Sequence, residues 1–191
     1  IYRPMRGDVL INELVSDPAD REDEWIELTN TTQRKLDLSG WSIEDGVGTR
    51  VMLSETLDAT SDNRYMVITA ANGFLDNPGD RVILRSSDGT IIDEATYGNW
   101  DDGDVRDNAA VAIDPFSLAR VGNTYYSRDD FRITATPTKG ASNKITDKKP
   151  HDDESAPTII ISELVPHPSS LDPAHEFIEL HNQNNIPVNL G

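Results

Sequence analysis

The chain of 191 residues is long enough for one domain with a full hydrophobic core and part of a second. Its formal charge of −17 and isoelectric point near 4.4 exclude a nucleic-acid partner, because binding phosphates requires a cationic surface. The absence of cysteine excludes disulfides and thiol chemistry, and no apolar run approaches the ~18 residues of a membrane span, so we expect no membrane insertion.

Short runs of branched and aromatic residues predict strands along most of the chain. Asp88-Gly89 predicts a tight hairpin turn, and a break at Ser39-Gly40 separates two short strands around residues 36–38 and 41–43. The other expected strands are residues 9–15, 25–29, 65–69, 81–85, 90–93, 117–120 and 131–133. No window has a sustained helical period, so the chain is expected to be all-β and to form a β-sandwich.

Strand alternation predicts which side chains face the core. Ile26 and Leu28 are expected inside, and Glu27 on the other side of the strand, as is Trp25. On that side Glu27 is expected to be solvated or paired with an arginine, and Arg120 is the candidate partner. We also expect Gly40 to relieve a bend and Trp41 to be a core residue.

The beginning of the chain is repeated near its end. Ile11-Asn12-Glu13-Leu14 returns as Ile161-Ser162-Glu163-Leu164, and residues 24–28 (Glu-Trp-Ile-Glu-Leu) return as residues 176–180 (Glu-Phe-Ile-Glu-Leu). The period is that of a domain rather than of a solenoid repeat. We therefore expect one complete domain in residues 1–143, a polar linker in residues 144–157 and the first part of a second copy in residues 158–191.

The complete copy resembles the lamin tail domain family. The resemblance rests on the repeated motifs above and on Leu36-Asp37-Leu38-Ser39-Gly40-Trp41, Pro78-Gly79-Asp80-Arg81-Val82, Tyr97-Gly98, Ser117-Leu118-Ala119-Arg120, Thr136-Pro137, Gly140 and Asn143. It implies an immunoglobulin-like sandwich with a binding or spacing role and no catalysis. The resemblance to prokaryotic members implies an accessory domain of a secreted or surface protein, often in tandem and sometimes beside nucleases or other hydrolases.

The sequence offers little for catalysis. Residues 1–150 contain no histidine, so the first domain cannot hold a Ser-His or Cys-His pair, and we expect no catalytic residue. His175, Glu179 and His181 fall on one face of an expected strand, which suggests a zinc site. Alternate residues of a strand are about 7 Å apart, however, so His175 and Glu179 are too distant to share an ion without a bend.

Two features near residue 100 are candidates for binding. Asp101, Asp102, Asp104 and Asp107 surround Gly103 and offer the hard oxygen ligands that calcium takes, so Ca²⁺ is the candidate cofactor; the alternative is a solvated acidic loop. Trp100 is expected either to contact a carbohydrate or protein or to pack at the edge of the sandwich.

We therefore expect a non-catalytic binding, adhesion or spacer module of a larger secreted or cell-surface protein, with a protein or a cell-surface polymer as its partner. The alternatives are an accessory domain of a secreted hydrolase or nuclease, and a calcium-dependent assembly module. The apolar residues of the partial repeat need a surface to pack on, which predicts contact with the first domain or self-association through residues 158–190.

Overall fold

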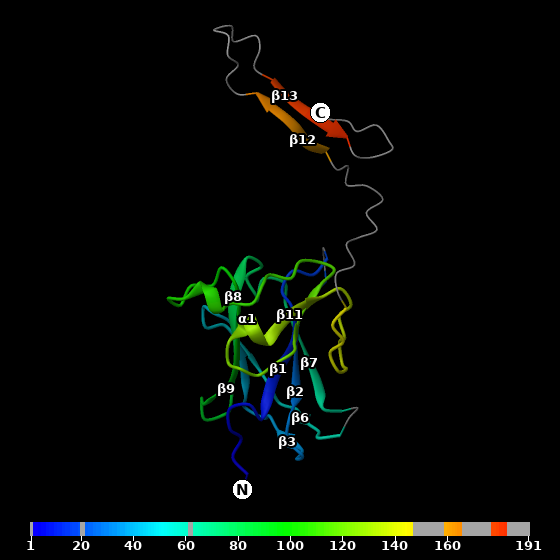
Figure 1. Cartoon of the computed structure of the whole chain (residues 1–191). Helices are drawn as coiled ribbons and strands as arrows, with labels where there is room; N and C mark the ends of the chain where they lie inside the picture. The colour runs from blue at the N-terminus through cyan, green and yellow to red at the C-terminus, as the bar shows by residue number, and fades with distance from the viewer. Residues whose placement is uncertain (1, 20–21, 61–62, 147–158, 166–176, 183–191) are drawn as a thin grey trace. The chain divides into compact units, whose positions relative to one another are not determined.

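The computed structural model describes residues 2–19, 22–60, 63–146, 159–165 and 177–182. The chain divides into two compact units, Ile1–Lys148 and Lys149–Gly191, which are described one at a time (Figure 1). None of the helices among the described residues is long and apolar enough to cross a membrane.

The regular secondary structure of the first unit consists almost entirely of short strands, because its branched and aromatic residues come in runs separated by Gly, Pro, Asn and Asp. Two single-turn helices, η1 (Val105–Asp107) and α1 (Ser127–Asp130), are the exceptions in the described part of this unit. The strands are β1 (Val9–Val15), β2 (Glu24–Asn30), β3 (Leu36–Asp37), β4 (Ser42–Glu44), β5 (Arg50–Met52), β6 (Thr56–Leu57), β7 (Tyr65–Ala70), β8 (Gly79–Arg85), β9 (Ile91–Gly98), β10 (Ser117–Arg120) and β11 (Phe131–Thr134).

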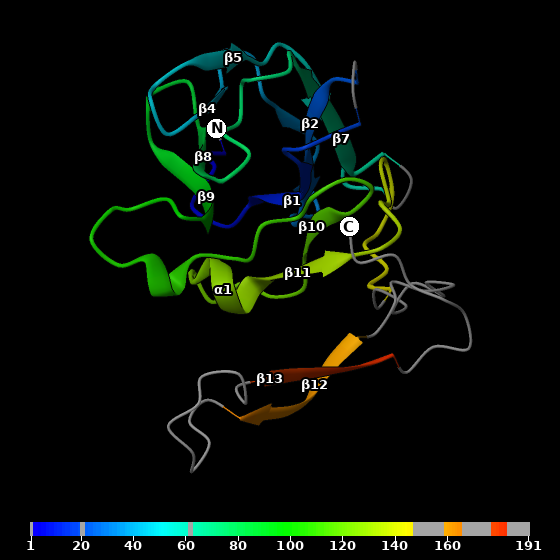
Figure 2. The same ribbon diagram turned by 90° about the horizontal axis from the view of Figure 1, so that it is seen from above.

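The strands form two main antiparallel sheets. One has five strands in the order β11-β10-β1-β2-β7, the other has four in the order β5-β4-β8-β9, and β3 pairs with β6. Seen from above, β1, β2 and β7 lie in one layer and β4, β8 and β9 in the other (Figure 2). The immunoglobulin-like sandwich predicted from the sequence is confirmed.

The core lies between the two sheets. Ile26 and Leu28 of β2 are fully buried there, as predicted, and Trp41 is 3% exposed. Residues from both sheets contribute to this core, which includes Ile11, Leu14, Ile43, Leu57, Val82, Leu84, Ile92, Tyr97 and Leu118. Each Å² of apolar surface removed from water contributes about 25 cal/mol to stability, so this core is the main source of the stability of the first unit.

Two glycines allow close approaches that a side chain would block. Gly40 has φ 79°, and a Cβ there would lie 3.2 Å from the Ser87 Cβ, which confirms the predicted bend. Gly98 has φ 62°, and a Cβ there would lie 2.1 Å from the Pro78 carbonyl oxygen. The second approach was not predicted, because it depends on β8 and β9 pairing along their whole length, to Gly79 opposite Gly98.

The hairpin predicted at Asp88-Gly89 joins β8 to β9, with Gly89 at φ 84°. The sequence did not predict β5 and β6, which have three and two residues, too few for alternation to be visible. Residues 144–146, predicted to begin the linker, instead continue the first unit: the Ala135 N–H donates to the Thr146 carbonyl. Residues 147–157 of the predicted linker lie outside the described residues.

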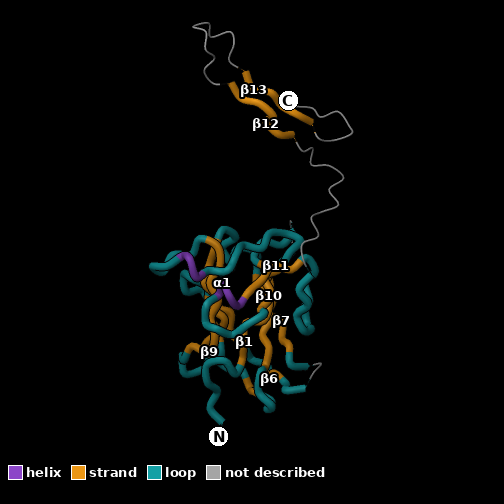
Figure 3. The backbone as a smooth tube through the Cα atoms, viewed as in Figure 1, coloured by secondary structure: helices purple, strands orange, loops and turns teal. Residues whose placement is uncertain are grey.

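The second unit contains a hairpin of β12 (Ile159–Val165) and β13 (Phe177–Asn182), drawn as strands in Figure 3. Its pairing repeats that of β1 and β2, since Ile161 faces Leu180 as Ile11 faces Leu28. Both hairpins have a register shift one residue later, before Glu13 and Glu163. The sequence repeat therefore extends to backbone pairing, including the position of the bulge.

Candidate functional site

The two glutamates of the repeated motif form a buried pair in the first unit. The bulge in β1 places Glu13 directly opposite Glu27 of β2, and both residues are fully buried. They lie on the outer face of the five-stranded sheet. Ile26 and Leu28 lie on its other face, in the sandwich core. The prediction that Glu27 is solvated or paired with Arg120 is therefore wrong.

A strap of residues 134–146 crosses this face and buries the two carboxylates. Thr138 donates to Glu13 Oε2 from its backbone N–H at 3.0 Å and from its hydroxyl at 2.7 Å, and Ser117 Oγ also donates to Glu13. The Gly140 N–H donates to Glu27. The sequence did not predict this arrangement, because it brings together chain segments that are more than 110 residues apart in the sequence.

Asparagines complete the hydrogen bonding under the strap. Asn12 Nδ2 donates to Glu27 at 2.7 Å, and Asn143 Nδ2 donates to the Asn12 carbonyl at 2.9 Å and to the Arg120 carbonyl at 2.8 Å. Burial raises the pKa of Glu27, against the opposing effect of the hydrogen bonds from Asn12 and Gly140. We call the hydrogen-bonded residues Asn12, Glu13, Glu27, Thr138, Gly140 and Asn143 the clasp, because their bonds hold the strap on the sheet.

Comparison with known families identifies the architecture. Residues 3–99 match the family model described as Lamin Tail Domain, and this match covers slightly more than half of the chain. The chain belongs to the lamin tail domain family. No curated protein matches it significantly. The family is an immunoglobulin-like one, consistent with a non-catalytic module, and the match does not extend to residues 158–191.

A second buried cluster joins the two ends of the lamin tail domain. Arg120 donates to the Ile11 carbonyl and to Asp93, both at 2.6 Å, and its guanidinium lies 4.5 Å from the centre of the Phe131 ring. Asp130, 3.5 Å from the same guanidinium, completes the cluster. Burial raises the pKa of Asp93 to about 6, although the charge of Arg120 acts in the opposite direction.

Asp130 also shapes the loop before it. Its carboxylate accepts the N–H groups of Thr124 at 2.6 Å and Tyr125 at 3.0 Å, and Tyr125 has a positive φ of 71°. A non-glycine residue with positive φ is strained, so these bonds stabilise a conformation that the loop would otherwise leave. Asp93 and Asp130, the two acids beside Arg120, thus have structural roles that no sequence motif predicts.

The four aspartates predicted to bind calcium lie in the loop before and within η1. Asp101 and Asp102 are exposed, and Asp104 is bound by Arg106 through Nε at 2.7 Å and Nη2 at 2.8 Å, which lowers the pKa of Asp104 to about 2. Among the described residues, no three acidic or histidine side chains lie close enough together to hold a metal ion. The structure thus gives Asp104 a partner in its own loop and does not test calcium binding itself.

The buried end of the same loop has unused hydrogen-bonding groups. Asp107 Oδ1 and Asn108 Oδ1 are buried without a hydrogen-bond partner in the described part of the chain, and so is the Trp100 ring nitrogen. Asn108 is 8% exposed, and its Nδ2 donates to the carbonyls of Gly98 and Trp100. Calcium at this loop stays a prediction, with Asp107 as the member that has a free buried oxygen.

Two further sequence candidates are placed by the structure. Trp100 is partly buried, and a Cβ on Gly46 would come within 2.4 Å of its ring, so the ring packs at the edge of the sandwich. Glu179 and His181 are exposed on β13, whereas His175 of the suggested zinc set lies outside the described residues.

Proposed function

We propose that this lamin tail domain is a non-catalytic binding or spacer module, one of a series within a larger secreted or cell-surface protein. The observation that carries the proposal is the second hairpin. Glu163 and Glu179 of β12 and β13 face each other as Glu13 and Glu27 do, and both hairpins share the bulge. A chain that builds the same hairpin twice, one domain length apart, is organised as a tandem array.

The state of the buried carboxylates supports the non-catalytic part. Glu24 accepts the N–H groups of Gly73 and Leu75 at 2.6 and 2.7 Å, and Asp80 accepts that of Gly46 at 2.9 Å. Like Glu13 and Glu27, these acids are engaged with backbone donors of their own domain. A general base instead needs a lone pair within reach of a substrate proton.

The test measures, with the same protein, whether any substrate is turned over and whether the protein is retained by an insoluble polymer. The whole chain is incubated with phosphodiester, ester, glycoside and peptide substrates, and separately sedimented with insoluble cell-wall polymers. We expect no turnover, and the proposal is overturned if a reaction appears that Glu27→Gln abolishes while the fold is kept. Fractionation of cells that express the full-length protein tests the location, and recovery only from the cytosol would contradict it.

A further inference from the structure

The five-stranded sheet has one edge without the usual protection. β7 (Tyr65–Ala70) forms that edge and pairs with β2 without a break, from Tyr65 opposite Thr29 to Ala70 opposite Glu24. It contains no Lys, Pro or Gly and no bulge, which are the devices that keep natural sheet edges from pairing with other chains. β7 is therefore competent to accept another strand.

The other edges of the two main sheets are partly covered or short. At β9 the Ala109 N–H donates to the Thr96 carbonyl, and the Gly98 N–H donates to the Ala109 carbonyl. At β11 the strap returns, and the Ala135 N–H donates to the Thr146 carbonyl. β5 has three residues, and a short edge is itself protective. Within the two main sheets of the first unit, β7 is therefore the longest edge strand that no other segment covers; β12 and β13 of the second unit have edges of their own.

The register shows which backbone groups are free on β7. The Asn30 N–H donates to the Arg64 carbonyl at 2.9 Å, so this pair is hydrogen-bonded. Because such pairs alternate in antiparallel sheets, Met66 and Ile68 bond to β2, while Tyr65, Val67 and Thr69 point their N–H and C=O groups away from it. Within the described ranges, no group bonds to that side of β7.

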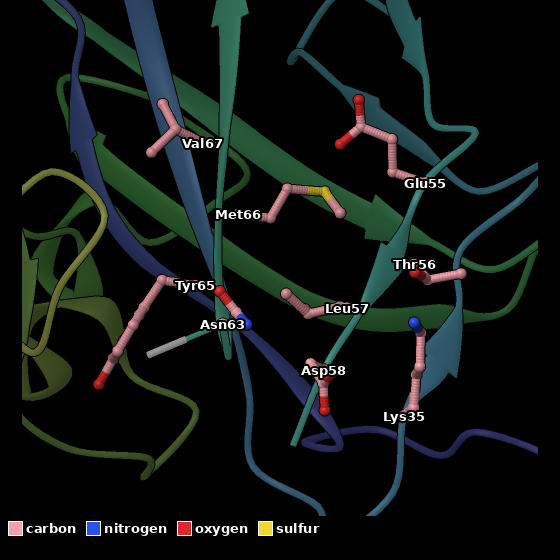
Figure 4. Close-up of a pocket in the computed structure, with 9 residues that line it drawn as sticks. All are labelled: Lys35, Glu55, Thr56, Leu57, Asp58, Asn63, Tyr65, Met66 and Val67. Atoms are coloured by element: carbon pink, nitrogen blue, oxygen red, sulfur yellow. The ribbon is translucent and has the colours of Figure 1, made fainter. Parts of the chain in front are cut away.

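A groove keeps this side of β7 apart from the opposite sheet. A cavity of about 440 Å³ lies between β6 and β7, and a smaller one of about 190 Å³ continues it past Val51 and Met52. Figure 4 shows Met66 and Leu57 turned toward each other across the groove, with Val67 on the other side of β7. Met52 is 62% exposed. The groove thus leaves space beside Tyr65, Met66 and Val67, and the smaller cavity leaves space beside Ile68 and Thr69.

We propose that β7 is a pairing edge for a second copy of this chain, through an antiparallel contact with a two-fold axis at Val67. That axis places Val67 opposite its own equivalent and Tyr65 opposite Thr69 of the other copy. Both are favourable cross-strand pairs of branched and aromatic residues, and an isologous contact closes as a dimer.

Charged residues lie at both ends of β7. Arg64 precedes β7, and Lys35 lines the groove at this end beside Tyr65. At the other end, exposed Glu22 and Asp23 precede the β2 residue that pairs with Ala70. The Arg64 end also carries Glu55 and Asp58 in the groove, so the basic residues there are accompanied by acids. The net charge of −17 opposes association, so the dimer is weak and strengthens as salt screens the repulsion.

The test is cysteine cross-linking, which is clean because the chain has no cysteine. A hydrogen-bonded pair has Cα atoms about 5.5 Å apart, within disulfide range, so Val67→Cys forms a disulfide-linked dimer under mild oxidation. Thr69→Cys alone is the matched control on the same strand, since its two copies are offset by four residues. Val47→Cys, at an 81% exposed position, measures random collision.

We expect Val67→Cys to cross-link at least about five-fold faster than either control, and faster in about 1 M than in about 0.1 M salt. A mixture of Tyr65→Cys and Thr69→Cys proteins also cross-links. Sedimentation of the cysteine-free chain shows a concentration-dependent dimer that Val67→Lys removes without lowering the melting temperature.

Three results would overturn the proposal. One is equal rates for Val67→Cys and Val47→Cys in proteins that melt like the wild type. Another is equal rates for Val67→Cys and Thr69→Cys, which would mean a different register or a different surface. The third is a strictly monomeric chain whose Val67 amide is protected from hydrogen exchange, which would mean that β7 is covered by the chain's own residues.

Discussion

Replacing Arg120 by methionine is expected to destabilise the lamin tail domain strongly. The Arg120 side chain is 6% exposed and the Asp93 side chain 3% exposed. Removing the cation leaves two buried carboxylates, Asp93 and Asp130, without their counter-ion, and removes the bond to the Ile11 carbonyl. Breaking a buried ion pair in this way costs about 3–5 kcal/mol. For a domain of this size the corresponding fall in melting temperature is on the order of 10 °C.

The loss is expected to depend on pH in a defined direction. The folded-state pKa of Asp93 is about 6, above the unfolded value, so the native state binds the extra proton. Stability from this group is therefore fully present below the unfolded pKa and is lost as pH rises through the folded pKa. Without the guanidinium, which lowers that pKa, the loss extends to higher pH. The difference between variant and wild type is thus smaller at pH 5 than at pH 8.

The assay is urea unfolding followed by circular dichroism at both pH values. Arg3→Met is the control, because Arg3 pairs with Asp88 at 2.8 Å but its side chain is 85% exposed, so its loss is worth less than about 1 kcal/mol. The reasoning is refuted if Arg120→Met costs less than about 1 kcal/mol at pH 8, or if its cost is the same at both pH values.

Three further outcomes are expected. Glu27→Ala removes the acceptor for the strap and costs about 2–3 kcal/mol, with faster trypsin cleavage after Lys139; unchanged cleavage would contradict the clasp. Gly98→Ala places a Cβ 2.1 Å from the Pro78 oxygen and lowers the melting temperature by more than about 5 °C, whereas a neutral effect would show that β8 and β9 do not approach so closely. Calcium, compared with EDTA and with magnesium, raises the melting temperature by several degrees and Asp107→Asn abolishes the rise; coincident curves would remove the calcium hypothesis.

Most of the sandwich could be predicted from sequence because its signals are local. Alternation identified Ile26 and Leu28 as core residues, and Asp88-Gly89 identified the turn between β8 and β9. These signals depend on neighbours within a few residues, so they survive without knowledge of the tertiary structure. The same is true of the repeat, whose second hairpin adopts the pairing of the first.

The environment of Glu27 could not be predicted because it is set at a distance. Alternation placed this residue on the face turned away from the core, where a charged side chain is ordinarily solvated. The strap covers that face with residues from the end of the domain, and Gly140 is 113 positions away from Glu27 in the sequence. The partners of Arg120 were missed for the same reason, since Asp93 lies 27 residues from it on a different sheet.

The clasp has a consequence for the order in which the chain folds during synthesis. Its bonds join Asn12 and Glu27 to Asn143 and Gly140, which are 131 and 113 residues later. Until those late residues leave the ribosome, Glu27 has Asn12 as a donor but lacks Gly140, and Glu13 lacks Thr138. The strap can close over these two carboxylates only after its own residues have been made. The clasp is therefore completed at Asn143, shortly before the β12–β13 hairpin begins at Ile159.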